Sequence, residues 1–184
     1  KMEEIKSNCE ERMKKTINAL RDEYAGLRTG RASPALLDRI RVDYYGQKSP
    51  LNQVASVSVQ DSRTIVIQPW DKALLAEIEK SIQKSELGIN PSNDGKVVRI
   101  VVPPLTEERR KELVKTAKTS AEQSRVGIRN IRRDSIEDIK KKKDSAFSED
   151  VVKKLEDELQ KLTDSYISQI NKILEEKEKE IMEV

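Results

Sequence analysis

The sequence contains no histidine, a single cysteine and few aromatic residues, which make up 3% of its 184 positions. Without histidine, neither a histidine-based nucleophile–base pair nor the usual zinc-ligand sets can form. One cysteine excludes an internal disulfide framework and fits a reducing compartment. Because Cys9 falls within a regular apolar pattern, we interpret it as a core residue rather than a reactive thiol.

Several common motifs are also absent. The sequence has no G-x-x-x-x-G-K-[ST] phosphate loop, no G-x-G-x-x-G and no H-E-x-x-H. No apolar run approaches the roughly 18 residues of a membrane span, and the first residues lack the apolar centre of a signal peptide. These absences predict a cytoplasmic protein that is not an enzyme, with no catalytic residue, no metal site, no cofactor and no membrane partner.

Charged residues are abundant, at 38% of the chain, although the net charge is only +3. The distribution is uneven: residues 105–143 carry 13 basic and 7 acidic side chains, whereas residues 144–184 carry 6 basic and 12 acidic ones. A high charge content with few aromatics is typical of long solvated helices. The two segments therefore predict a basic helix and an acidic helix.

Three segments show the three- and four-residue apolar spacing of amphipathic helices. The first covers Met2–Leu27, the second opens at a Thr106 cap and runs to about Lys143, and the third begins after Ser148 and continues almost to the end. The short break at Asp144–Phe147 predicts that the last two are antiparallel neighbours. The expected core positions are Ile5, Cys9, Met13, Ile17, Leu20, Tyr24 and Leu27; Leu113, Ala117, Ala121, Ser124, Ile128 and Ile131; and Val152, Leu155, Leu159, Leu162, Tyr166, Ile170, Ile173 and Ile181.

The pattern changes between Gly30 and Pro104, where all six prolines and four of the six glycines lie. Short alternating or apolar runs indicate strands at 40–44, 55–59, 64–67 and 97–102, and a helix is expected over Asp71–Leu87 with Gly88 as its stop. The fold class is therefore α+β: an elongated antiparallel three-helix bundle (1–29 and 105–184) with an inserted small β/α/β domain (31–103).

An inserted domain is joined to its host by two chain crossings, which we expect at 29–31 and 102–105. Glycine gives the first crossing backbone freedom and two prolines stiffen the second. The interpretation is a hinge between two bodies; the alternative is a rigid elbow. The hinge residues are Thr29, Gly30, Arg31, Pro103, Pro104 and Leu105.

Basic residues follow one stripe of the second helix. Successive positions rotate by about 100°, so Lys111, Lys118, Arg125, Arg129 and Arg132 fall within about 60° of arc, beside the apolar stripe. Arg133 and Lys140–Lys143 extend the basic end. Guanidinium groups suit phosphate oxygens, and aromatics do not interleave with them, which favours structured RNA. The alternative is that these groups pair with acidic side chains of the third helix.

Several motifs in order resemble the bacterial ribosome-recycling factor family along essentially the whole chain. They are Arg28-Thr-Gly-Arg-Ala-Ser-Pro34, Val42-Asp-Tyr-Tyr-Gly46, Asp61-Ser-Arg-Thr64, Leu87-Gly-Ile-Asn-Pro91, Pro103-Pro-Leu-Thr-Glu-Glu-Arg-Arg-Lys111 and Arg129-Asn-Ile-Arg-Arg-Asp134. Gly127 departs from the family pattern, which has alanine more often there, and a glycine inside a helix costs up to about 1 kcal/mol.

The resemblance implies a monomer that binds the post-termination ribosome at the subunit interface and acts with elongation factor G. That partner hydrolyses the GTP, and the subunits separate. The resemblance further implies that Arg110, Arg129 and Arg132 are the principal contacts to large-subunit ribosomal RNA, with Arg28 and Arg31 as weaker candidates near the hinge.

Two other functions remain open from the residues alone. A coiled-coil adaptor would use its helices to bind a partner helix and would not depend on ribosomes. A hydrolase acting through carboxylates would need two converging acids in the 31–104 segment, and the sequence identifies no such pair.

Overall fold

The computed structural model describes residues 2–85, 87–146 and 148–183. They form two compact units: residues up to Ala25 together with Lys111–Glu183 make a helical unit, and Gly26–Arg110 makes a β-rich unit. All the predicted hinge residues lie within the β-rich unit by this division. In the described ranges, no helix is both long and apolar enough to cross a membrane.

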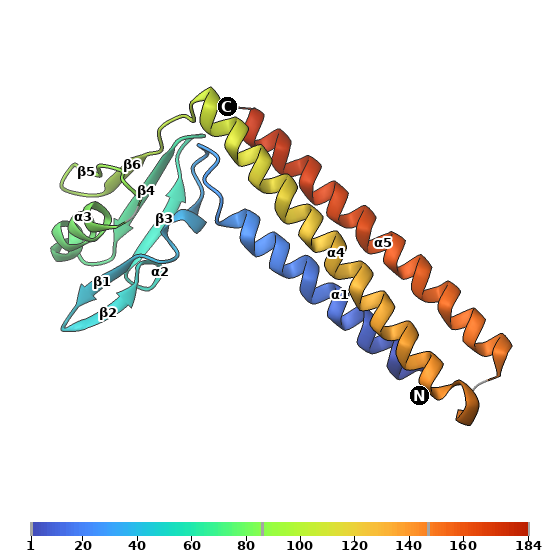
Figure 1. Ribbon diagram of the computed structural model, residues 1–184. Coiled ribbons are helices and arrows are strands. Elements are labelled where there is room, and N and C mark those ends of the chain that lie inside the picture. Colours follow the sequence, from blue (N-terminus) through green and yellow to red (C-terminus); the bar gives the residue numbers. More distant parts are fainter. Residues whose placement is uncertain (1, 86, 147, 184) are drawn as a thin grey trace. The chain divides into compact units, whose positions relative to one another are not determined.

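Three long helices build the helical unit in the described part of the chain: α1 (Met2–Ala25), α4 (Glu107–Ala146) and α5 (Glu149–Met182). Figure 1 shows them side by side, with α4 running opposite to α1 and α5. At about 1.5 Å per residue, the 40 residues of α4 extend over about 60 Å. The bundle is therefore elongated and antiparallel, and the predicted α+β fold class is confirmed.

Both predicted helix starts are capped, at Thr106 as predicted and also at Ser148. The Thr106 Oγ1 accepts a hydrogen bond from the Arg109 N–H at 3.1 Å, and the Ser148 Oγ accepts one from the Val151 N–H at 3.3 Å. The predicted end of α4 at Lys143 was too early, because the helix continues to Ala146. Phe147, the last residue of the predicted break, lies outside the described residues.

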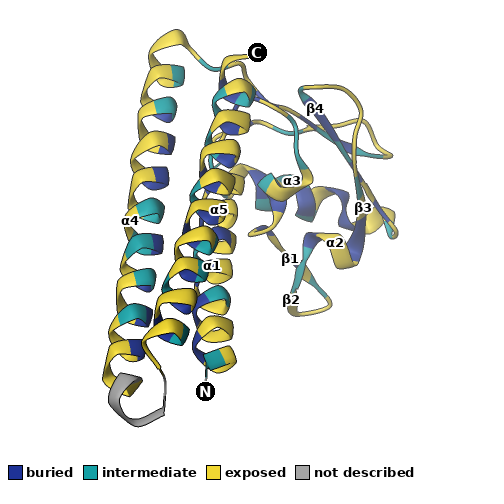
Figure 2. Cartoon of the chain, turned by 90° about the vertical axis from the view of Figure 1, so that its right-hand side faces the viewer, coloured by how far each residue is buried: buried dark blue, intermediate teal, exposed yellow. Residues whose placement is uncertain are grey.

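The core of the helical unit follows the apolar spacing closely (Figure 2). Most predicted core positions are buried, but Leu27, Ser124 and Leu162 are only half-buried. Two polar residues of α5 are buried instead: the Thr163 hydroxyl donates to the Leu159 carbonyl at 2.7 Å, and Lys177 pairs with Glu180 at 3.0 Å. Polar groups enter this core because each one has a partner on its own helix.

The described residues of the β-rich unit form two antiparallel sheets. Strands β1 (Arg41–Tyr44) and β2 (Gln47–Pro50) form a hairpin, and a four-stranded sheet has the order β3-β4-β6-β5. Its strands are β3 (Ala55–Val59), β4 (Thr64–Pro69), β5 (Ser92–Asn93) and β6 (Val98–Val101).

Short helices complete this unit: η1 (Pro34–Leu37), α2 (Leu51–Val54), η2 (Lys72–Leu74) and α3 (Leu75–Lys84). The helix predicted over Asp71–Leu87 corresponds to η2 and α3, so it ends three residues early. Gly88 lies beyond the helix end, with a φ of +63°. Sequence patterns did not predict β2, β5, α2 or η1.

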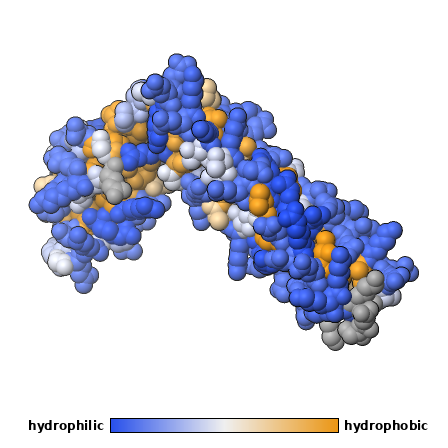
Figure 3. All heavy atoms as spheres, in the orientation of Figure 1, coloured by the Kyte–Doolittle hydropathy of each residue, from blue (hydrophilic) through white to orange (hydrophobic). Residues whose placement is uncertain are grey.

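The core of the β-rich unit joins α3 to the four-stranded sheet. Ile78 and Ile82 of α3 belong to the same buried cluster as Ile65 and Ile67 of β4 and Ile100 of β6. Isoleucines at alternate strand positions share one face of the sheet, and this face receives the helix. The visible outer faces are hydrophilic over most of their area (Figure 3), as expected when the apolar stripes point inward.

Candidate RNA-binding face and chain crossings

Helix α4 carries the basic stripe along the helical unit. Lys118 and Arg133 are exposed, whereas Arg125, Arg129 and Arg132 are half-buried. Half-burial follows from the position of the stripe beside the apolar face, where aliphatic stems pack while the charged ends remain at the surface. We call Lys118, Arg125, Arg129, Arg132 and Arg133 the α4 basic face.

Arg125 is held from two sides. Its Nε donates to the Asn171 Oδ1 of α5 at 2.8 Å, and its Nη1 lies 2.9 Å from the Glu122 Oε2 on its own helix. The other oxygen of Glu122 lies 3.6 Å from the Arg129 Nη1. Glu122 therefore orients two arginines and partly balances their charge.

Arg132 is held by a neutral group. Its Nη1 donates to the Gln160 Oε1 of α5, and the Gln160 amide donates in turn to the Asp164 Oδ1 at 3.0 Å. The Arg132 Nε is buried and has no hydrogen-bond partner among the described residues. The glutamine therefore fixes the guanidinium without cancelling its charge.

The alternative to an RNA-binding stripe was that these basic groups pair with acidic side chains of the third helix. In the described ranges, Arg125 and Arg132 donate hydrogen bonds to α5 at the amide oxygens of Asn171 and Gln160, and no ion pair joins either of them to an α5 carboxylate. Acids of α5 instead pair elsewhere, as Glu158 does with Lys6 at 3.5 Å. The α4 basic face therefore keeps most of its positive charge.

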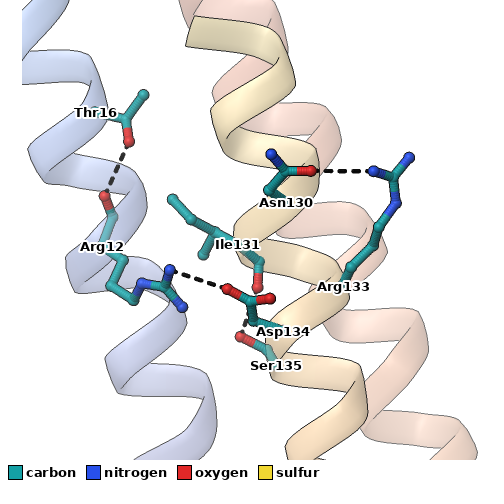
Figure 4. A network of polar contacts seen from close by, with 7 residues as sticks. All are labelled: Arg12, Thr16, Asn130, Ile131, Arg133, Asp134 and Ser135. Carbon is teal, nitrogen blue, oxygen red and sulfur yellow. Dashed lines mark hydrogen bonds and ion pairs between the residues drawn. The ribbon is translucent and has the colours of Figure 1, made fainter.

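The end of the basic face is drawn in Figure 4, where Asp134 points toward α1 and Arg133 points away from it. The Arg12 guanidinium donates to the Asp134 Oδ2 at 3.1 Å, which joins α1 to α4. The Arg133 Nη1 donates to the Asn130 Oδ1 at 3.1 Å on its own helix. Asp134 therefore helps to join two helices of the bundle, whereas its neighbour Arg133 keeps its charge at the surface.

Three further predicted RNA contacts lie in the β-rich unit. Arg110 is half-buried in the first turn of α4, where its N–H donates to the Thr106 carbonyl at 3.0 Å. The Arg28 Nη1 donates to the Leu87 carbonyl at 2.6 Å, and Arg31 is exposed. Arg28 therefore anchors the chain that follows α1 to the segment after α3.

The two predicted crossing segments lie side by side within the β-rich unit. Gly30 has a φ of +82°, and a Cβ added there would lie 3.4 Å from both the Cγ and the backbone N of Leu105. Glycine suits this position for two reasons: residues with a side chain rarely adopt this positive φ, and Leu105 lies close to where a Cβ would be. Thr29 is buried beside it.

One turn holds both crossing segments. The Ala32 N–H donates to the Ser62 carbonyl at 2.8 Å, and the Val102 N–H donates to the Arg63 carbonyl at 2.7 Å. The Asp61 Oδ1 shapes this turn by accepting from the N–H groups of Arg63 and Thr64 at 3.0 and 2.8 Å. These hydrogen bonds lower the pKa of Asp61 below its usual range, and the bond from the Arg63 N–H has the largest effect.

This turn was not predicted as the support of the crossings. A signal was present, because an Asp followed by Ser-Arg-Thr between two strand patterns is typical of a side-chain-capped turn. The partners of the turn, 30 to 40 residues away in either direction, carry no local sign of it.

Comparisons with known proteins agree over the whole chain. The family model described as Ribosome recycling factor matches residues 20–182. A protein from Treponema denticola named Ribosome-recycling factor is 61% identical, covering 99% of each chain, and one of the same name from Syntrophomonas wolfei is 59% identical over 100% of both.

Two solved structures are also similar to this chain over nearly its whole length. A solution structure of the ribosome recycling factor has a TM-score of 0.79 and 48% identity, covering 100% of this chain and 98% of its own. A second, with a TM-score of 0.67 and 48% identity over 99% of each chain, is described as models for the T. thermophilus ribosome recycling factor and the E. coli elongation factor G bound to the E. coli post-termination complex.

Proposed function

The chain belongs to the ribosome recycling factor family, and from this premise we propose that it binds the post-termination ribosome and, with elongation factor G and GTP, separates the ribosomal subunits. Family membership confirms the prediction of a translation factor rather than an enzyme. In this proposal elongation factor G hydrolyses the GTP, and the chain requires no cofactor. It acts in protein biosynthesis in the cytoplasm, where the ribosomes are.

The α4 basic face is the proposed contact to large-subunit ribosomal RNA at the subunit interface. Arg129 and Arg132 are its principal residues, and Arg110 at the start of the helix is proposed as a further principal contact outside this face. Lys118, Arg125 and Arg133 support them, and Arg28 and Arg31 are weaker candidates. The observation that carries the proposal is how α5 supports the face: it holds Arg125 and Arg132 through the neutral amides of Asn171 and Gln160 rather than through carboxylates. A planar cation held in this way suits the oxygens of a phosphate backbone.

The second part of the proposal is a hinge at 29–31 and 102–105 that lets the β-rich unit move as a body. It is supported by the positive φ of Gly30 and by the shared turn, which ties both segments to β3 and β4. Because both segments are tied to the same turn, they would move together with the β-rich unit as one body.

The hinge is tested by single-molecule energy transfer between dyes on Lys15→Cys and Lys96→Cys, one position in each unit. Cys9 is the only native cysteine and is 1% exposed, so the introduced cysteines are labelled selectively. A broad distribution of transfer efficiencies, or two populations, is expected. A single narrow population would favour the rigid elbow.

The activity is tested with purified post-termination ribosomes, elongation factor G and GTP. Light scattering follows subunit separation, and addition of this chain is expected to accelerate it. A rate equal to that with elongation factor G alone would contradict the function and favour the adaptor hypothesis. Sedimentation of the chain alone checks the proposed monomer.

Arg132→Ala tests the RNA face. Loss of one phosphate contact is expected to weaken ribosome binding and to reduce the slope of log K against log salt by about 1. Arg21→Ala is the matched control: it removes one exposed arginine from α1 of the same unit. If both variants bind equally well with equal slopes, the α4 basic face is not the contact.

A further inference from the structure

A cleft of about 280 Å³ lies on the β-rich unit, between the β1–β2 hairpin and α3. Its charged lining is mainly basic: Arg39, Arg41, Lys48, Lys80 and Lys84 outnumber Asp43 and Glu77. Because the walls of a cleft exclude water, charges of one sign reinforce one another there and attract a polyanion. We call this depression the hairpin cleft, and the five basic side chains just named are its basic residues.

These cations are not neutralised within the unit. In the described part of the chain, no ion pair joins any of the five to a carboxylate, including Asp43 and Glu77 of the same cleft. By contrast, Arg99 of the same unit is paired with Asp94. The Arg41 Nη1 donates to the carbonyls of Asp38 and Ile40 at 2.8 and 3.2 Å, which fixes its position without cancelling its charge.

An exposed aromatic residue stands on the same hairpin. Tyr45 lies in the turn between β1 and β2, is 82% exposed and has a φ of +50°, a backbone region that favours glycine or asparagine. Its ring centroid lies 4.4 Å from that of Tyr44. The Tyr45 ring therefore packs against Tyr44 and still leaves most of its surface in solvent.

We propose that the hairpin cleft, with Tyr45, is a second RNA-binding site, separate from the α4 basic face. The basic groups contact phosphates of a looped or single strand, and an unstacked base lies on the Tyr45 ring. Basic grooves combined with exposed aromatics are typical of binding to unpaired nucleotides, because every base has a face that can stack. An acidic protein segment would use the cations but would not need the ring.

The test measures binding of the full chain to a fluorescein-labelled 12-nucleotide oligouridylate by fluorescence anisotropy at several KCl concentrations. Lys80→Gln/Lys84→Gln removes two exposed charges of α3. The affinity is expected to fall at least threefold, and the slope of log K against log salt by about 1.4, since each phosphate contact to a single strand contributes about 0.7. Lys72→Gln/Lys96→Gln removes two exposed lysines of the same unit outside the cleft, and its slope should stay near that of the unchanged chain.

Tyr45→Asn tests the ring, because asparagine tolerates the turn's positive φ. Its affinity for oligouridylate is expected to fall about fivefold or more with an unchanged salt slope. Circular dichroism melting checks that each variant folds.

Three results would overturn the proposal. The first is equal effects of the two lysine pairs, and the second is absence of binding by the unchanged chain. The third is loss of binding to a labelled oligoglutamate in Lys80→Gln/Lys84→Gln while oligouridylate still binds, which would assign the cleft to an acidic protein. Since the probe is free RNA, failure of the ribosome experiments would leave these outcomes unaffected.

Discussion

The two compact units encode their folds at different distances along the chain. In the helical unit, apolar residues three or four positions apart indicate the core positions. A cap residue marks the start of each of the two later helices. In the β-rich unit, β4 pairs with β6 across more than 30 residues, as Thr64 does with Val101. Local periodicity therefore predicts the helical unit closely and the β-rich unit only in outline.

The glycines show the same contrast. Gly127 lies inside α4 with ordinary helical geometry, and the nearest atom to an added Cβ is the Thr16 Cγ2 at 3.8 Å. Gly30 has a φ of +82° and lies against Leu105. The first glycine is replaceable and the second is required, in line with their places in the sequence, within a helical pattern and at a chain crossing.

The largest expected effect comes from a cavity made separately in each unit. Leu159→Ala in α5 and Ile67→Ala in β4 both truncate side chains with no exposed surface, and each should lower the free energy of unfolding by about 2–5 kcal/mol. If the units unfold separately, Ile67→Ala shifts mainly the fluorescence transition of Trp70, the only tryptophan, which lies in the β-rich unit. Leu159→Ala then shifts mainly far-UV circular dichroism. Equal shifts in both signals would mean one cooperative fold.

Alkaline pH should weaken the helical unit through Tyr24. Burial raises the pKa of Tyr24 to about 12, so between pH 10 and 12 the folded chain keeps a proton that the unfolded chain has lost. This contribution is complete below pH 10 and falls as the pH rises, by about 2–3 kcal/mol at most.

Denaturant unfolding at pH 9 to 11.5 measures this loss. Tyr24→Phe should remove this part of the pH dependence, at a cost of about 1 kcal/mol at neutral pH for the lost hydrogen bond to the Ala117 carbonyl. An unchanged alkaline slope in that variant would assign the effect to other groups, such as Tyr166, whose pKa is also raised by burial.

Alanine at the two glycines should have opposite effects. Gly30→Ala is expected to cost about 1–2 kcal/mol, because a side chain disfavours the positive φ. Gly127→Ala should stabilise the helix by up to about 1 kcal/mol, since alanine is the better helix former and its methyl group meets only ordinary contacts. Thermal unfolding of the two variants beside the unchanged chain measures both. Destabilisation by Gly127→Ala would show that α4 needs this glycine.

The smallest expected effect is on the β-rich unit at acid pH. The pKa of Asp61 is lowered by the N–H groups that its carboxylate accepts, so its contribution is present above about pH 4 and is lost as the pH falls further. Asp61→Asn keeps an acceptor oxygen and removes the titration. Acid titration of the Trp70 fluorescence should show a shallower loss in this variant than in the unchanged chain. A loss of the same steepness would show that the turn does not govern acid stability.

Much of the candidate site was predictable because it follows helical geometry. Arg125, Arg129 and Arg132 were placed on one stripe from spacing alone, and their residue type indicated phosphate oxygens. Arg110 came from the resemblance to the family. Neither the spacing nor the resemblance predicted the roles of Asn171 and Gln160, because these residues lie on another helix and look like ordinary surface residues in the sequence.

The three amphipathic helices, the capped starts of the later two, the basic character of α4 and the family could all be predicted from residue order, because each depends on a few helical turns or on long exact motifs. The groups that neutralise or support the arginines became known only from the packed structure. It also brought Gly30 against Leu105, tied both crossings to the Asp61 turn and gathered the hairpin cleft from β1, β2 and α3. Contacts between distant segments depend on how whole elements pack, and this packing does not appear as a periodic pattern in the sequence of the residues that it brings together.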